Sequence, residues 1–99
     1  MYVIREVVTC KPGKVGQMVD KFKALSTAMR AIGYEPLRLL TDVSGDPFWT
    51  VVAEANVGTV DEFFAIERKL RESDAVRQAM AGYHDLVTSG RREIYRVEG

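Results

Sequence analysis

The sequence of 99 residues predicts one α+β domain with the ferredoxin-like element order βαββαβ. Apolar residues three and four positions apart predict two helices, and short runs of β-branched residues predict four strands. Because crossover connections are right-handed, both helices should cover the same face of a four-stranded antiparallel sheet. The chain is long enough for one core, so we expect a single domain over residues 1–99.

The first strand is predicted over Tyr2–Cys10 and ends at the turn residues of positions 11–13. Pro12 suits the first position of a helix, because its missing N–H has no partner there in any case. We therefore expect the first helix to start at Pro12 and to run to about Ile32, before Gly33. Its apolar positions are Val15, Met18, Val19, Phe22, Leu25, Met29 and Ile32.

Residues 35–43 and 48–55 predict two strands of a hairpin, joined by the turn at 44–47. A capping box from Thr59 to Glu62 predicts the start of the second helix. The helical spacing of its apolar residues is interrupted after Leu70, and Ser73 is a good N-cap. We therefore expect the helix to break there. A further helical piece should extend to Val87, and residues 91–97 should form the last strand after a stop at 89–90.

The charge balance and the rare residues exclude several classes of function. The 14 basic and 14 acidic residues leave no net charge, which argues against nucleic-acid binding by counterion release. One cysteine excludes an internal disulfide, and with one histidine it cannot form a structural zinc site, so we expect no metal. We find neither a span of about 20 apolar residues nor a signal peptide, and expect a cytoplasmic protein without membrane contact.

Apolar residues occupy both alternations of the predicted strands, although the two helices can cover only one face of the sheet. Val3 and Val7 alternate with Ile4 and Val8 in the first strand, for example. We therefore expect a homodimer in which two sheets pack face to face and bury at least about 1,200 Å².

The segment at residues 5–14 (REVVTCKPGK) resembles the strand-to-helix motif that opens NIPSNAP-like domains. The strand containing Trp49, followed by residues 59–64, is similar to the second half of the same family. More broadly, the chain resembles the dimeric α/β-barrel superfamily, which includes antibiotic-type monooxygenases, IsdG-type haem-degrading oxygenases and EthD-like proteins. This resemblance implies the dimer but does not decide the reaction.

His84 is the only imidazole and hence the candidate acid or base; the alternative is a surface histidine near a helix end. Trp49 is either a core or interface residue or a group that positions a ligand. Phe63 and Tyr83 have the spacing of core residues and would otherwise line a pocket. Tyr34 offers a hydroxyl to a cleft or packs on a strand.

Arg5 on the first strand has two interpretations. It forms a cross-strand charge ladder with Glu93, or it points between sheet and helices and holds a carboxylate or phosphate. Cys10 is either a small buried hydrophobic residue or a thiol activated by the start of the first helix.

Residues 73–80 resemble the helix that carries the haem ligand in IsdG-type enzymes. In that alignment the ligand histidine corresponds to Met80, and His84 lies one turn later. The first strand also lacks the asparagine of those enzymes. We therefore expect a protein that uses no haem and no other cofactor.

Three functions remain open. The first is a NIPSNAP-like dimer that binds a small apolar or aromatic molecule between sheet and helices. The second is a cofactor-independent monooxygenase, in which His84 acts as base and Trp49 positions an aromatic substrate. The third is a structural or regulatory dimerisation module. A cavity containing His84 favours the second, and a fully packed interior favours the third.

Overall fold

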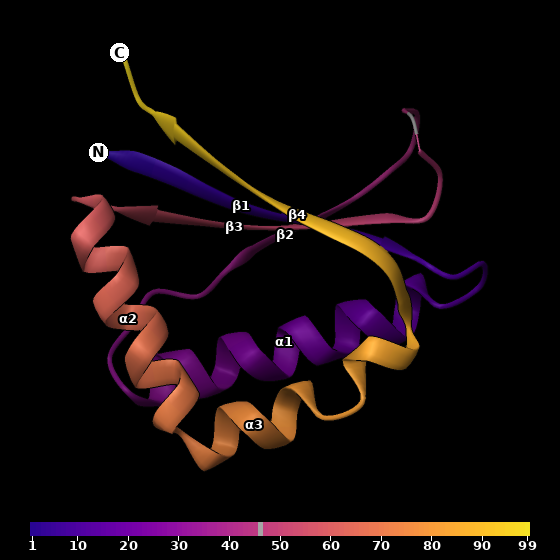
Figure 1. Ribbon diagram of the computed structural model, residues 1–99, viewed down its shortest axis with the longest axis horizontal. Coiled ribbons are helices and arrows are strands. Elements are labelled where there is room, and N and C mark those ends of the chain that lie inside the picture. The colour runs from indigo at the N-terminus through magenta and orange to yellow at the C-terminus, as the bar shows by residue number, and fades with distance from the viewer. Residues whose placement is uncertain (46) are drawn as a thin grey trace.

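The computed structural model describes residues 1–45 and 47–99, so Asp46 of the predicted hairpin turn lies outside the described residues. The elements follow each other as β1 (Tyr2–Cys10), α1 (Val15–Ala31), β2 (Arg38–Thr41), β3 (Thr50–Val57), α2 (Val60–Glu72), α3 (Asp74–Met80), the 3₁₀ turn η1 (Tyr83–Asp85) and β4 (Val87–Arg96). Four strands form one sheet in the order β2-β3-β1-β4, and every pairing is antiparallel. Figure 1 shows all helices on one side of this sheet, which confirms the predicted ferredoxin-like fold.

Helix α1 begins at Val15, so the prediction of Pro12 as its first residue is wrong. Gly13 has a positive φ of 79°, which a right-handed helix does not accommodate. Residues 11–14 instead form a turn in which Lys14 N–H donates to the Lys11 carbonyl over 3.0 Å. The helix starts directly after this turn.

The predicted break between α2 and α3 is confirmed. Thr59 Oγ1 accepts a hydrogen bond from Glu62 N–H over 3.0 Å, and the Glu62 carboxylate accepts one from Gly58 N–H over 2.9 Å. Ser73 ends α2, and its hydroxyl accepts from Val76 N–H at the start of α3. Helices α2 and α3 thus each begin with a side-chain cap that replaces a missing backbone acceptor.

The predicted end of the last helix is wrong. Helix α3 stops at Met80, because Gly82 adopts a left-handed conformation with φ of 77° that turns the chain into η1. Strand β4 begins at Val87 rather than at residue 91, and Gly90 pairs with Val8 inside the ladder. Because glycine is uncommon inside a strand, the Ser-Gly pair at residues 89–90 is more typical of the end of a helix, and this explains the wrong prediction.

The hairpin strands differ from the prediction for identifiable reasons: β2 is shorter, and β3 keeps its length but begins and ends two residues later. Pro36 has no N–H to donate, and Leu37 N–H donates to Ser26 Oγ on α1 over 2.8 Å, so β2 begins only at Arg38. At the other end, Trp49 has a positive φ of 66°, and β3 starts one residue later. Trp49 therefore lies before the strand and not in the middle of the sheet.

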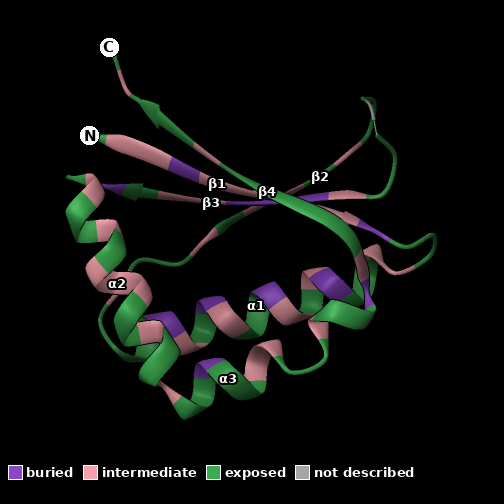
Figure 2. Ribbon diagram, viewed as in Figure 1, coloured by how far each residue is buried: buried purple, intermediate pink, exposed green. Residues whose placement is uncertain are grey.

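The core lies between the sheet and α1, as the buried residues in Figure 2 show. It consists of Cys10, Met18, Phe22, Val51, Ala53 and Leu86. Strand alternation and the strand pairings put even-numbered residues of β1 on this helix face and odd-numbered ones on the open face. Within the described residues, no helix is long and apolar enough to cross a membrane.

The open face carries apolar side chains, as expected from the sequence, and charged side chains between them. Val3, Val7, Leu40 and Val52 lie on it by their place in the strand pairings. Between them, Arg5 pairs with Glu54 of β3 on one side and with Glu93 of β4 on the other.

Candidate functional site

A cleft of about 590 Å³ lies between strands β1 and β4 and helices α1 and α3. We call it the α3 cleft. Its apolar lining comes from Val8, Met18, Phe22, Leu25, Met80 and Val87, and its polar lining includes Glu6, Arg92, Tyr83 and His84. An apolar groove with a few polar groups is the usual form of a small-molecule site.

The sequence builds this cleft from two periodicities. Glu6 and Val8 are two residues apart on β1 and face the helices, as do Gly90 and Arg92, their partners on β4. Met18, Phe22 and Leu25 recur at helical spacing on α1 and form the opposite wall. Because Gly90 has no side chain, the wall of the cleft is recessed at this point of β4.

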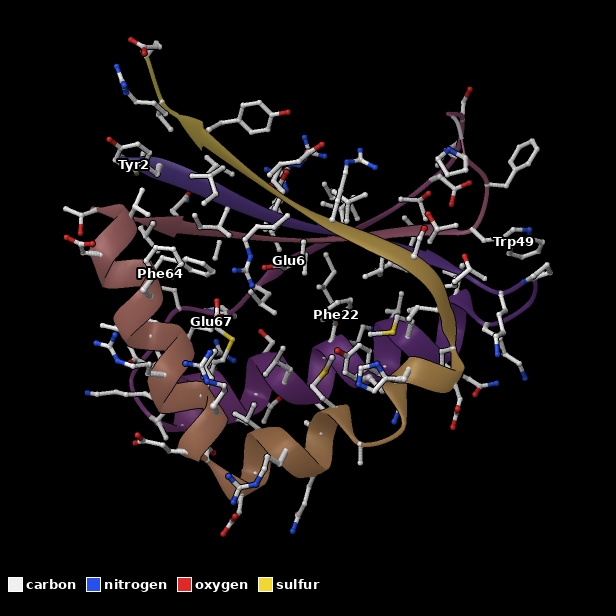
Figure 3. The ribbon with its side chains drawn as sticks, viewed as in Figure 1. Tyr2, Glu6, Phe22, Trp49, Phe64 and Glu67 are labelled. Carbon is white, nitrogen blue, oxygen red and sulfur yellow. The ribbon has the colours of Figure 1, made fainter. Side chains whose placement is uncertain are left out.

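Arg92 organises the polar groups between the sheet and α2. Its Nε donates to Glu6 Oε1 over 2.5 Å, and its Nη2 lies 3.1 Å from Glu67 Oε2. Its Cζ atom also lies 4.8 Å from the centre of the Phe63 ring, in cation–π geometry. Figure 3 shows Glu6 below the sheet and Glu67 on α2, on the same side of the molecule. One guanidinium thus links β1, β4 and α2.

His84 lies in η1, on the exposed rim of the α3 cleft. Its ring and that of Tyr83 have centroids 4.0 Å apart with planes at 34°. The histidine is therefore a surface residue and a cleft residue at once. Met80, which matches the haem-ligand position of the IsdG-type pattern, lines the same cleft.

The remaining predicted ligand-binding residues lie elsewhere. Tyr34 and Phe63 line a second cleft of about 780 Å³ below the end of β3, which we call the α2 cleft. Arg5 lies on the open face, where its Nε is 3.7 Å from Glu93 Oε1, as the cross-strand ladder predicts. Trp49 is 43% exposed, and Figure 3 shows it at the far end of the sheet. The structure therefore divides the predicted residues: Tyr83 and His84 share the α3 cleft, Tyr34 and Phe63 share the α2 cleft, and Arg5 and Trp49 line neither.

The predicted site did not include the Glu6–Arg92 pair. Charged residues on the first and last strands are typical of a cross-strand ladder, and the alternative, an arginine that points between sheet and helices, applies here to Arg92 and not to Arg5. The sequence does indicate where Glu6 points, because residues 4, 6 and 8 of one strand lie on the same face, and Ile4 and Val8 are apolar. A charge within an apolar alternation indicates a polar group that points inward.

Cys10 is buried in the core beneath α1. Desolvation by burial raises the pKa of its thiol, because a thiolate would lose its hydration there. The residue therefore has the properties of a small hydrophobic side chain and not of an activated nucleophile.

Comparison with known proteins identifies the fold. A NIPSNAP domain protein from Burkholderia xenovorans superimposes with a TM-score of 0.82 at 14% identity, covering 98% of this chain and 94% of that one. A NIPSNAP family protein from Agrobacterium tumefaciens gives 0.80 at 16% identity, covering 96% and 90%. A Nitrosomonas europaea protein, named as a candidate antibiotic biosynthesis monooxygenase, gives 0.67 at 18% identity over the full length of both chains.

These likenesses confirm the NIPSNAP-like fold and its relation to the antibiotic-monooxygenase fold. At identities of 12% to 18% they define the architecture and leave the chemistry to the residues of this chain. No protein-family profile and no curated protein matches the sequence.

Proposed function

We propose that the protein binds a small apolar or aromatic molecule in the α3 cleft. The supporting observation is the composition of that cleft, where Leu25 and Met80 are partly exposed and the buried side chains of Met18 and Phe22 complete the apolar lining. The carboxylate of Glu6 accepts from Arg92 through Oε1 and has a second oxygen with which to orient a ligand. The cleft supports a binding protein over a purely structural module, for which no such cleft is needed.

A thermal-shift screen with naphthol and related aromatic alcohols and quinones tests this proposal. A ligand present at 100 times its Kd stabilises the folded chain by about 2.7 kcal/mol. The variant Gly90→Leu fills the recess without removing a lining side chain, so it should abolish the shift. Trp49→Phe, outside both clefts, is the matched control and should bind as the wild type does. Equal shifts for all three proteins would refute the α3 cleft as the site.

The second candidate is a cofactor-independent monooxygenase, and the position of His84 on the rim of the α3 cleft favours it. In this scheme His84 removes a proton from an electron-rich aromatic substrate, and the resulting carbanion adds O2 and a proton to form a hydroperoxide. Loss of water then breaks the O–O bond and leaves one oxygen atom in the product as a carbonyl group. Oxygen uptake with a hydroquinone or anthrone substrate tests it. Uptake that is saturable in substrate and lost in His84→Ala would support an enzyme, whereas binding without uptake would leave a binding protein.

We also propose that the chain forms a homodimer through the open faces of two sheets. The supporting features are Val3 and Leu40, which stay partly exposed on a face that the helices leave uncovered, as Figure 1 shows. Val7 and Val52 lie on the same face and are already buried in the single chain. Tyr95, more than half exposed, lies on the same face of β4. Sedimentation should therefore give twice the chain mass of 11.1 kDa at micromolar concentration. A monomer under these conditions would refute the dimer.

A further inference from the structure

Four charged residues form a row that crosses the open face at one level of the sheet. The strand pairings place Arg38 of β2 beside Glu54 of β3, Glu54 beside Arg5 of β1, and Arg5 beside Glu93 of β4. The signs therefore alternate from one edge of the sheet to the other. We call these four residues the charge row.

The contacts within the row are close but incompletely satisfied. Arg5 Nε lies 3.2 Å from Glu54 Oε1 and 3.7 Å from Glu93 Oε1, and Arg38 Nε lies 4.0 Å from Glu54 Oε2. Within the described part of the chain, neither the buried Nε of Arg5 nor any other atom of its side chain forms a hydrogen bond of good geometry. The guanidinium at the centre of the row therefore retains donors for a further acceptor.

A row of four charges with alternating signs is complementary to a second copy of the same row that runs in the opposite direction. A two-fold axis parallel to the strands, between β3 and β1, reverses the strand order of a facing copy. Arg38 then faces Glu93 of the partner subunit, and Glu54 faces Arg5 of the partner subunit. An axis along the row would instead place every charge opposite its own copy, which is repulsive. The row thus distinguishes two ways of stacking the same pair of faces.

We propose that the charge row fixes the orientation of the homodimer, so that β2 of one subunit lies over β4 of the other. This inference rests on the proposed sheet-to-sheet dimer. Facing sheets lie about 10 Å apart, a distance that arginine and glutamate side chains from both sides span together. The row supplies orientation more than affinity, because the desolvation of charges offsets much of their attraction.

Complementary charge reversals test the proposal. Glu54→Arg gives the row three positive charges, and Arg5→Glu gives it three negative charges, so each variant should associate with itself at least about 100-fold more weakly than the wild type. A mixture of the two variants places every positive charge opposite a negative one and should restore the dimer. Glu54→Gln, which adds no repulsion, is the matched control and should weaken association less. Circular dichroism establishes that each variant is folded.

Sedimentation of the single variants and of their mixture separates the outcomes. If Glu54→Arg does not fold, Arg38→Glu and Glu93→Arg give the same design on the outer pair of the row. A dimeric wild type whose reversed variants also dimerise alone, or whose mixture stays monomeric, would overturn the orientation while leaving the dimer intact. A monomeric wild type would overturn the dimer proposal itself.

Discussion

Arg92 of β4 donates a hydrogen bond from Nε to Oε1 of Glu6 on β1 over 2.5 Å. The same guanidinium reaches Glu67 of α2, so a single cation serves two carboxylates from different elements. Within the described residues, the buried Glu67 Oε2 has no aligned hydrogen bond and is paired with Arg92, whereas Glu67 Oε1 accepts a hydrogen bond from Arg71 Nη1 over 3.0 Å. Arg92 therefore positions the polar end of the α3 cleft and connects it to α2.

Replacement of Arg92 by Met should lower the free energy of unfolding by about 1–2 kcal/mol, because it leaves two carboxylates without their shared partner. Glu6→Gln should cost less, since Arg92 then keeps Glu67. Urea denaturation of both variants measures the difference. Equal losses in the two variants would show that Arg92 and Glu67 do not interact in solution.

The Cys10 thiol gives a stability that depends on pH in a defined direction. Its folded pKa lies above the value of 9.0 expected for an unperturbed thiol, so the folded chain holds the proton more tightly. The contribution is complete below the unfolded pKa and declines as pH rises through that value toward the folded pKa. The stability difference between wild type and Cys10→Ala should therefore shrink between about pH 8 and about pH 10. A difference that grows over this range would contradict the burial of the thiol.

Two glycines should respond to the same substitution with opposite signs. Gly82 has a φ of 77°, whereas Gly16 lies inside α1, and an added Cβ meets no atom within 4 Å at either position. Gly82→Ala should therefore destabilise by about 1 kcal/mol through backbone strain alone. Gly16→Ala should stabilise by about 0.5–1 kcal/mol through helix propensity. Thermal denaturation that shifts both in the same direction would contradict the turn that ends α3.

Met18 is fully buried between α1 and the sheet. Truncation to Ala should cost about 2–5 kcal/mol, because the cavity adds to the lost burial. Val43 is fully exposed in the connection between β2 and β3, and Val43→Ala is the matched control with an expected change below about 0.5 kcal/mol. A small loss for Met18→Ala would mean that the space between α1 and the sheet collapses readily.

The sequence predicted the elements that local rules determine. Tyr2–Cys10 matched to the residue, and the caps at Thr59 and Ser73 appeared where side-chain chemistry required them. The boundaries that failed depend on distant atoms or unusual torsions. Strand β2 is shorter because Leu37 N–H donates a hydrogen bond to Ser26 on α1 and not to a neighbouring strand. The positive φ of Trp49 could not be predicted, because no residue type in this hairpin indicates a left-handed backbone at that position.

The site was less predictable than the fold, because it depends on which elements face each other. His84 and Tyr83 were identified from residue type and do lie on one cleft. The aromatic residues Tyr34 and Phe63 were grouped with them by type, yet the fold places them on another cleft. Glu6 and Arg92 come together only because β1 and β4 are neighbours, in a register that no local pattern specifies.

NMR of isotope-labelled methionine methyl groups, during titration with naphthol, tests the central claim most directly. Met18 and Met80 line the α3 cleft, whereas Met1 and Met29 line the α2 cleft, so the four methionines of the chain report on both sites at once. We expect saturable shifts of the Met18 and Met80 methyl signals, with those of Met1 and Met29 unchanged. Saturable shifts confined to Met1 and Met29 would place the binding site in the α2 cleft and contradict the account.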